Sequence, residues 1–177
     1  MDIFSAVERK NLRELKRILK TDPGAARDSD SWRRTALMLS CIEGEEAFVE
    51  LLLPWSDPSA SDRDGGTALM LASFGHPGCV KLLLPISDPK ARDADGWTPL
   101  MWAASSGNEK CVELLLPHSD TTAATQSGLT ALDIARAYDQ QARAQQIRRH
   151  MAEVDAMEAT GGVVQPESPV VKVEPRI

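Results

Sequence analysis

The sequence predicts an all-α fold, a solenoid of about five helix-turn-helix units with its terminal caps included. A pattern of the form Thr-Ala-Leu-Met recurs at intervals of 32, 31 and 32 residues, beginning at Thr35, Thr67, Thr98 and Thr130. A Leu-Leu-Leu-Pro pattern keeps the same period and ends at Pro54, Pro85 and Pro117. A fixed period of this length is typical of stacked repeats. Such folds usually present an extended binding surface rather than a catalytic pocket.

A single repeat is expected to contain a polar turn and two short helices. Residues 62–66 form the turn, and Thr67 is expected to cap the first helix with its hydroxyl. That helix should end at Gly75 in a left-handed conformation. A second helix, from Cys79 to Leu84, should stop before Pro85 because proline disfavours helical geometry in the residue before it. Helices this short are unstable alone, so stacking must stabilise them.

The flanking segments are interpreted as caps. Apolar residues from Ile3 to Leu19 have helical spacing and predict an N-terminal repeat with a charged outer face. At the other end, the polar helix after Tyr138 carries an apolar stripe of Ile147, Met151, Val154 and Met157, which is interpreted as a seam onto the body. The expected domain is therefore 1–158, divided into an N-cap repeat 1–30, repeats 31–61, 62–92 and 93–124, and a C-terminal repeat 125–158. Residues 159–177 are predicted to be a disordered tail.

Charge and composition argue against several classes of partner. Residues 35–130 contain five Lys and Arg residues against thirteen Asp and Glu residues, a net charge of −8. An acidic centre does not favour nucleic acid, which rewards a basic surface. No segment approaches the roughly 20 apolar residues that span a bilayer. The expectation is a cytoplasmic protein that binds neither nucleic acid nor membrane and is monomeric outside its complex.

The repeated patterns resemble the ankyrin repeat. Gly65-Gly66-Thr67 and Gly96-Trp97-Thr98-Pro99-Leu100 are similar to the start of its first helix, and Val80-Lys81-Leu82-Leu83-Leu84 is similar to its second helix. The form with Leu-Leu-Leu-Pro-x-Ser-Asp resembles bacterial ankyrin proteins. The family has histidine at the third position of the first helix, where this chain has Met38, Met70, Met101 and Asp133. Methionine packing is expected to replace the hydrogen bonds of that histidine.

The resemblance implies a partner-binding surface, the concave face, made by the turn tips and the exposed side of the first helices. Carried over by position, the tips contribute Trp32, Arg34, Arg63, Asp64, Asp95, Trp97 and Leu129. The first helices contribute Ile42, Glu43, Phe74, Ser105, Ser106 and Tyr138. Tryptophan, tyrosine and arginine are enriched in interface hot spots, which favours a protein partner. The alternative is that Trp32 and Trp97 only pack over adjacent turns. Trp102 is interpreted as a core residue.

The chemistry-bearing residues favour binding over catalysis. The three histidines, His76, His118 and His150, occupy unrelated positions, and no zinc spacing or phosphate loop is present. Cys41, Cys79 and Cys111 are interpreted as small buried hydrophobes rather than a metal or redox site. No enzyme activity, cofactor or metal is therefore expected. The first hypothesis is an interaction module that occupies or tethers a protein partner; the alternative is a dedicated inhibitor or immunity-type protein that blocks an enzyme's active site.

Overall fold

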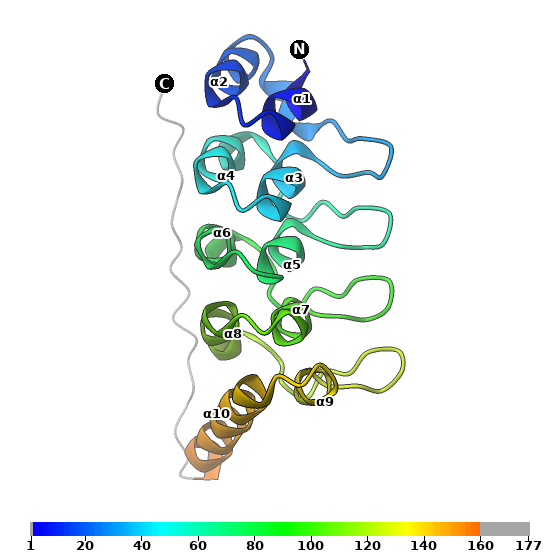
Figure 1. Ribbon diagram of the computed structural model, residues 1–177, viewed down its shortest axis with the longest axis vertical. Helices are drawn as coiled ribbons and strands as arrows, with labels where there is room; N and C mark the ends of the chain where they lie inside the picture. Colours follow the sequence, from blue (N-terminus) through cyan, green and yellow to red (C-terminus); the bar gives the residue numbers. More distant parts are fainter. Residues whose placement is uncertain (1, 160–177) are drawn as a thin grey trace.

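The structure, a computed structural model, describes residues 2–159, with their side chains as far as Ala156. Five helix pairs stack in chain order and form two parallel columns (Figure 1). The first column contains α1 (Ile3–Glu8), α3 (Ala36–Ile42), α5 (Ala68–Ser73), α7 (Pro99–Ser106) and α9 (Ala131–Ala137). The second contains α2 (Leu12–Thr21), α4 (Glu46–Leu52), α6 (Pro77–Leu83), α8 (Glu109–Leu115) and α10 (Gln141–Ala159). The predicted all-α repeat solenoid is confirmed.

The first helices α3, α5, α7 and α9 each begin after the recurring threonine. The hydroxyl of Thr35 accepts a hydrogen bond from the backbone N–H of Met38, at 3.3 Å, and Thr67 does the same for Met70. In return, the sulfur of Met38 accepts the backbone N–H of Thr35 at 3.4 Å, and Met101 accepts that of Thr98. Methionine therefore acts here as a buried cap as well as a packing group, because its sulfur is a weak acceptor.

The last of these threonines is capped by a carboxylate. Asp133 accepts the hydroxyl hydrogen of Thr130 at 2.6 Å and its backbone N–H at 3.1 Å. These side-chain and backbone hydrogen bonds to the ionised carboxylate hold the pKa of Asp133 below its ordinary value. The chain thus forms the same helix start in successive repeats with either a thioether or a carboxylate.

The second helices end before the recurring prolines, as the sequence predicts, and each continues into a short 3-10 turn. The turns are η2 (Leu53–Trp55), η3 (Leu84–Ile86) and η4 (Leu116–His118), and each contains its proline. A further 3-10 turn, η1 (Pro23–Arg27), follows α2. A 3-10 turn accommodates the proline because its first positions need no backbone N–H donor.

Four hairpin turns project beside the first helices (Figure 1). They span residues 30–34, 62–66, 93–97 and 125–129, and in each the first backbone N–H donates to the last carbonyl. The turns are also joined to one another. Arg63 N–H donates to the Trp32 carbonyl at 3.0 Å, and Ala94 N–H donates to the Asp64 carbonyl at 2.8 Å. Gln126 N–H completes the series by donating to the carbonyl of Asp95 at 2.9 Å.

The prediction of a left-handed Gly75 is wrong. Its helix, α5, ends in the right-handed residue Phe74, whereas Gly44, Gly107 and Asp139 are left-handed at the equivalent ends of α3, α7 and α9. Gly44 and Gly107 lie nine residues after their threonines, whereas Gly75 lies eight residues after Thr67. The second repeat has lost one residue at this point, so the chain enters α6 without the left-handed step.

One continuous core runs between the two columns of helices. Met38, Met70 and Met101 are buried, and so are Cys41, Cys79 and Cys111, as expected of small apolar residues. Burial raises the pKa of Cys79 and of Cys111 to about 11, so both thiols are protonated at neutral pH. Leu52, Leu83 and Leu115, the last residues of the second helices, are fully buried.

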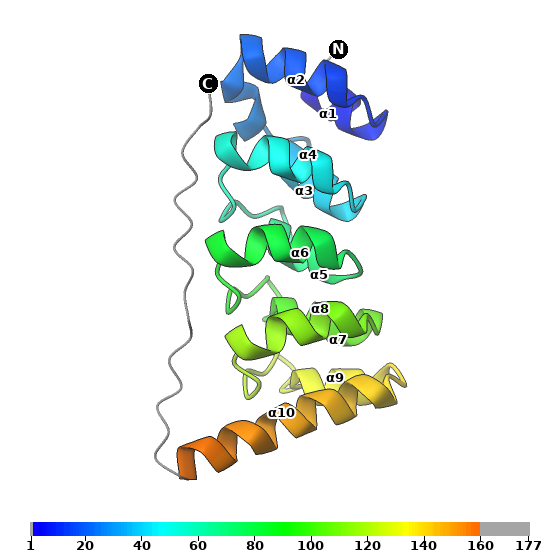
Figure 2. The same cartoon turned by 90° about the vertical axis from the view of Figure 1, so that its left-hand side faces the viewer.

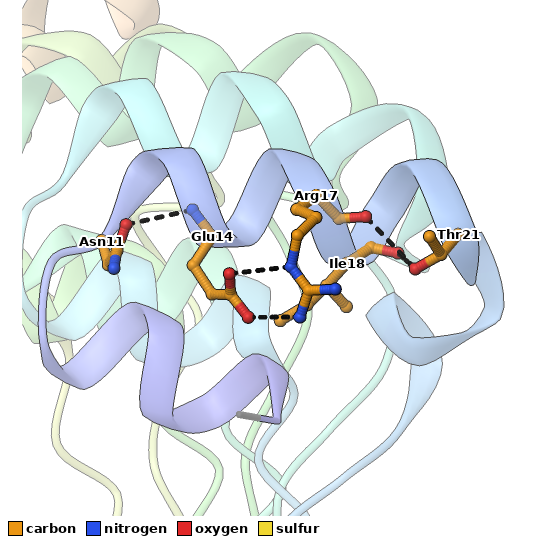
Figure 3. A network of polar contacts seen from close by, with 5 residues as sticks. All are labelled: Asn11, Glu14, Arg17, Ile18 and Thr21. Atoms are coloured by element: carbon orange, nitrogen blue, oxygen red, sulfur yellow. Dashed lines mark hydrogen bonds and ion pairs between the residues drawn. The ribbon is translucent and has the colours of Figure 1, made fainter.

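Polar side chains cover the N-terminal end of the stack. The side chain of Asn11 caps α2 by accepting the Glu14 N–H at 3.0 Å (Figure 3). Arg17 pairs with Glu14 through two hydrogen bonds of 2.9 and 2.7 Å, and the Thr21 hydroxyl donates to the carbonyls of Arg17 and Ile18. These groups lie on the exposed side of α2, while Leu15, Ile18 and Leu19 are buried against the next repeat.

The C-terminal end is covered by α10, which is longer than the other helices and runs across the end of the stack (Figure 2). Ile147, in its apolar stripe, is fully buried, and Met151 packs against the core. Arg143 does not lie on the outer polar face: its Nε donates to the Gly107 carbonyl at 2.7 Å and its guanidinium lies 3.8 Å from Glu109. The predicted tail lies, from residue 160 on, outside the described residues.

The buried leucine of a central second helix tests this packing. Leu83 is fully buried, whereas its neighbour Leu82 is only half-buried. We expect Leu83→Ala to lower the free energy of unfolding by about 2–5 kcal/mol through lost burial and the cavity that remains. Leu82→Ala, which removes the same atoms, should cost clearly less, as measured by urea denaturation. Equal losses would contradict the helix register described here.

Two glycines with the same backbone conformation test the contact between turns. Gly65 and Gly128 have φ values of 81° and 82°, but a Cβ on Gly65 would lie 2.8 Å from the Ala94 nitrogen, whereas nothing lies within 4 Å of one on Gly128. We expect Gly128→Ala to cost about 1–2 kcal/mol, the strain of a left-handed side chain.

Gly65→Ala should cost about 1 kcal/mol more than Gly128→Ala, because the added methyl also displaces the Ala94 N–H from the Asp64 carbonyl. Denaturation of the two variants under the same conditions provides the measurement. The turn-to-turn hydrogen bonds would contribute nothing measurable if both variants lost the same free energy.

Candidate functional site

The concave face collects the exposed apolar side chains of the described part of the chain. Five large hydrophobic residues are exposed there, with exposed fractions of 57% for Trp32, 56% for Phe74 and Tyr138, 42% for Leu129 and 37% for Ile42. All five belong to the residues that the sequence assigns to this face. Their clustering on one side matters because exposed apolar patches mark interaction surfaces more often than scattered single residues do.

An aspartate at the start of each of the first three hairpin turns organises the turn. The carboxylate of Asp62 accepts the backbone N–H groups of Asp64 and Gly66, and Asp93 accepts those of Asp95 and Trp97, at distances of 2.8–3.0 Å. Asp30 has the same role toward the backbone of Trp32 and Arg34. The backbone that carries the tip side chains is therefore held in each of these turns by hydrogen bonds to the aspartate of the same turn.

Asp30 also binds the guanidinium of Arg34 through hydrogen bonds of 2.9 and 2.7 Å. Partial burial opposes ionisation of Asp30, but these hydrogen bonds outweigh it and hold the pKa of Asp30 below its ordinary value. Arg34 is thus tied to its own turn. Arg63, in contrast, lies over the ring of Trp32, with 5.8 Å between its Cζ and the ring centroid, a cation–π contact that joins the first two turns.

Two hollows lie between the turns and the first helices. The N-terminal hollow is lined by Trp32, Arg34, Ile42, Asp62, Arg63, Asp64, Gly66, Leu71, Asp93 and Trp102. The C-terminal hollow, of about 600 Å³, is lined by Phe74, Asp93, Asp95, Trp97, Trp102, Ser105, Ser106 and Tyr138. Asp93 and Trp102 belong to both. Eleven of the thirteen residues predicted from the sequence line one hollow or the other.

The two remaining predicted residues are not brought into either hollow. Glu43 faces the N-terminal repeat, where its carboxylate lies 3.7 Å from the Lys10 ammonium, which also pairs with Glu45 at 2.8 Å. Hydrogen bonding to Glu45 raises the pKa of Lys10 above its ordinary value. Leu129 is exposed on the last turn, beyond the C-terminal hollow.

The interpretation of Trp102 as a core residue is wrong. Its side chain is half-buried and faces both hollows, and its indole N–H donates to the second carboxylate oxygen of Asp93 at 3.0 Å. The signal was present in the sequence. Trp102 precedes Ser105 and Ser106, which were assigned to the concave face, by three and four residues, a spacing that places side chains on the same side of a helix.

Trp97 is also placed differently from the expectation of an exposed tip. It is half-buried, packs against the core, and makes an edge-to-face contact with Trp102 at a centroid distance of 6.1 Å. Phe74 contacts the other side of this cluster, also 6.1 Å from Trp102. The alternative in which Trp97 packs over neighbouring groups therefore describes part of its role. Phe74, Trp97 and Trp102 form one aromatic cluster contributed by two repeats.

The described residues contain no candidate metal cluster and no membrane-spanning helix. No group of three or more His, Cys, Asp and Glu side chains within that part of the chain is placed to hold a metal ion. No helix in it is long and apolar enough to cross a membrane. A third hollow lies between residues 119–122 and α10 and is lined in part by His150, Met151 and Val154; the sequence had indicated only that the apolar stripe lies there.

Comparison with known proteins agrees with the repeat architecture. A family model described as ankyrin repeats, in three copies, matches residues 3–93 and 74–157. These two ranges together span most of the 177-residue chain. No match was found among curated proteins. With its stacked helix pairs, its projecting hairpin turns and this match along most of its length, the chain belongs to the ankyrin-repeat family.

Proposed function

We propose that this protein binds a protein partner through its concave face, at the two hollows, and has no catalytic activity of its own. Ankyrin repeats are generally protein-interaction modules and typically non-catalytic. The observation that carries the proposal is the gathering of the exposed large hydrophobic residues on this face, on the first and last hairpin turns and at the ends of first helices. A rigid apolar surface loses little conformational entropy when a partner covers it.

The architecture supports a partner that contacts several repeats at once. Trp32 lies on the first turn, Phe74 at the end of α5 and Tyr138 at the end of α9, so the exposed rings are spread over successive repeats. Because the helices of successive repeats pack together and their turns are joined by backbone hydrogen bonds, the backbone segments that carry these rings are held relative to one another. Hot-spot residues of this kind occur where aromatic rings fill pockets of the partner.

A partner captured from the source cells and mapped with surface variants tests the proposal. We expect Phe74→Ala and Tyr138→Ala each to weaken binding by about 2 kcal/mol or more, as for exposed aromatic hot spots. Their free energies of unfolding should change by less than about 1 kcal/mol, as at a surface site. Calorimetric titration with the captured partner and urea denaturation provide the two measurements.

Glu50→Ala and Lys81→Ala are the matched controls, since both residues are exposed on second helices, away from the hollows. They should leave binding unchanged. Binding that survives both aromatic substitutions, or that is lost in the controls, would place the interaction elsewhere. Trp97→Ala is a poor probe, because Trp97 packs against the core and its removal costs stability as well as contacts.

A second candidate function is inhibition of an enzyme by occupation of its active site. It is favoured by the net charge of −8 in residues 35–130 and by Asp64 and Asp95 at the turn tips, which would steer a basic target surface toward the concave face. The captured partner distinguishes the two functions. An inhibitor abolishes an activity of its partner at stoichiometric concentration, whereas a tethering module leaves that activity unchanged.

A further inference from the structure

The C-terminal hollow combines aromatic rings with negative charge. Phe74, Trp97, Trp102 and Tyr138 contribute rings, and Asp93 and Asp95 contribute carboxylates. The residues that line it, all within the described part of the chain, include no lysine, arginine or histidine. The faces of aromatic rings carry partial negative charge and attract cations. A hollow with this lining is complementary to a positive group supplied from outside.

The two carboxylates differ in whether their oxygens already accept hydrogen bonds. Asp93 is already occupied, because one of its oxygens accepts the N–H groups of Asp95 and Trp97 and the other accepts the indole N–H of Trp102. The side chain of Asp95 is exposed, and among the described residues its carboxylate makes no hydrogen bond or ion pair. Asp93 therefore fixes the aromatic wall, and Asp95 remains free to pair with a ligand.

The shape and chemistry of the hollow exclude other occupants. A hard metal ion such as Ca²⁺ takes six to eight oxygen ligands, and Asp95 alone provides too few. An apolar side chain would pack against the aromatic rings. It would also remove the Asp95 carboxylate from water without giving that carboxylate a partner, which is unfavourable. A cationic side chain satisfies the rings and the carboxylate together.

Arginine fits this surface better than lysine does. Its guanidinium is planar, stacks on aromatic faces, is weakly hydrated and pairs with a carboxylate through two hydrogen bonds. The neighbouring hollow shows the same pairing within the chain, where the Arg63 guanidinium lies over Trp32. In the C-terminal hollow no arginine of the described chain fills the equivalent role.

We propose that the C-terminal hollow takes an arginine side chain of the protein partner, held against its aromatic rings and paired with Asp95. This inference rests on the proposed function, since it specifies what the concave face recognises. Recognition then depends on charge as well as apolar contact, and the acidic central repeats increase the encounter rate with a basic segment.

Short peptides on the full chain test the inference directly. The probes are the capped tripeptides Gly-Arg-Gly, Gly-Lys-Gly and Gly-citrulline-Gly, the last of which keeps the shape of arginine without its charge. Binding is followed by NMR through the indole N–H signals of Trp97 and Trp102, with Trp55, which lies in η2, as the internal control. We expect the arginine peptide to shift the first two signals saturably and to bind at least about five-fold more tightly than the citrulline peptide.

Two matched variants test whether the Asp95 carboxylate pairs with the arginine. Asp95→Asn should weaken the arginine peptide at least about five-fold, the size of an exposed charge-assisted contact. Asp88→Asn removes an exposed carboxylate that lies outside both hollows, and should leave the affinity unchanged. Equal binding of arginine and citrulline, equal effects of the two variants, or no saturable shift with any peptide would overturn the inference.

The proposed function is tested separately from the arginine inference. If the peptides fail while Phe74→Ala and Tyr138→Ala still abolish capture of the partner, the concave face binds its partner without an arginine anchor, and only this inference fails. If capture of the partner is also indifferent to these substitutions, the proposed function itself is wrong. A lysine peptide that binds as tightly as the arginine peptide would overturn the preference for a guanidinium.

Discussion

The contact between one repeat and the next is the constraint on which this structure depends. The first helices contain six to eight residues, and α4, α6 and α8 contain seven, well below the roughly 12–15 residues at which an isolated helix becomes stable in water. Each helix therefore persists because its apolar side is buried against a neighbour. The same dependence requires a polar surface at both ends, which the Asn11–Glu14–Arg17 network and α10 provide.

The hairpin turns extend that neighbour contact to the concave face. Backbone hydrogen bonds join the turns edge to edge, from Trp32 to Arg63, from Asp64 to Ala94 and from Asp95 to Gln126. Glycine at the fourth position of the second and third turns allows the close approach, since a side chain at Gly65 or Gly96 would meet the backbone of the next repeat. The interactions that hold the repeats together therefore also fix the positions of the tip residues.

Asp93 shows how one side chain can organise both a turn and the wall of the hollows. It closes its own turn through the backbone of Asp95 and Trp97, and at the same time orients the indole of Trp102 from α7. Trp102 in turn lines both hollows and makes edge-to-face contacts with Phe74 and Trp97. From the sequence, Asp93 would be taken for a solvent-exposed surface residue. Its carboxylate instead links a turn, a helix and the aromatic cluster.

The sequence by itself determined the repeat period, the threonine starts of the first helices and the proline stops of the second. Each is local chemistry, settled by a hydroxyl cap, a missing N–H donor or a 31- to 32-residue spacing. It also placed most residues of the concave face, because position within a repeat decides which side of a helix a residue occupies. Only the tertiary structure decided that Phe74 meets Trp102 of the next repeat and that Arg143 turns inward to the carbonyl of Gly107. These contacts join neighbouring repeats, and a spacing rule within one repeat carries no information about what the next repeat places opposite.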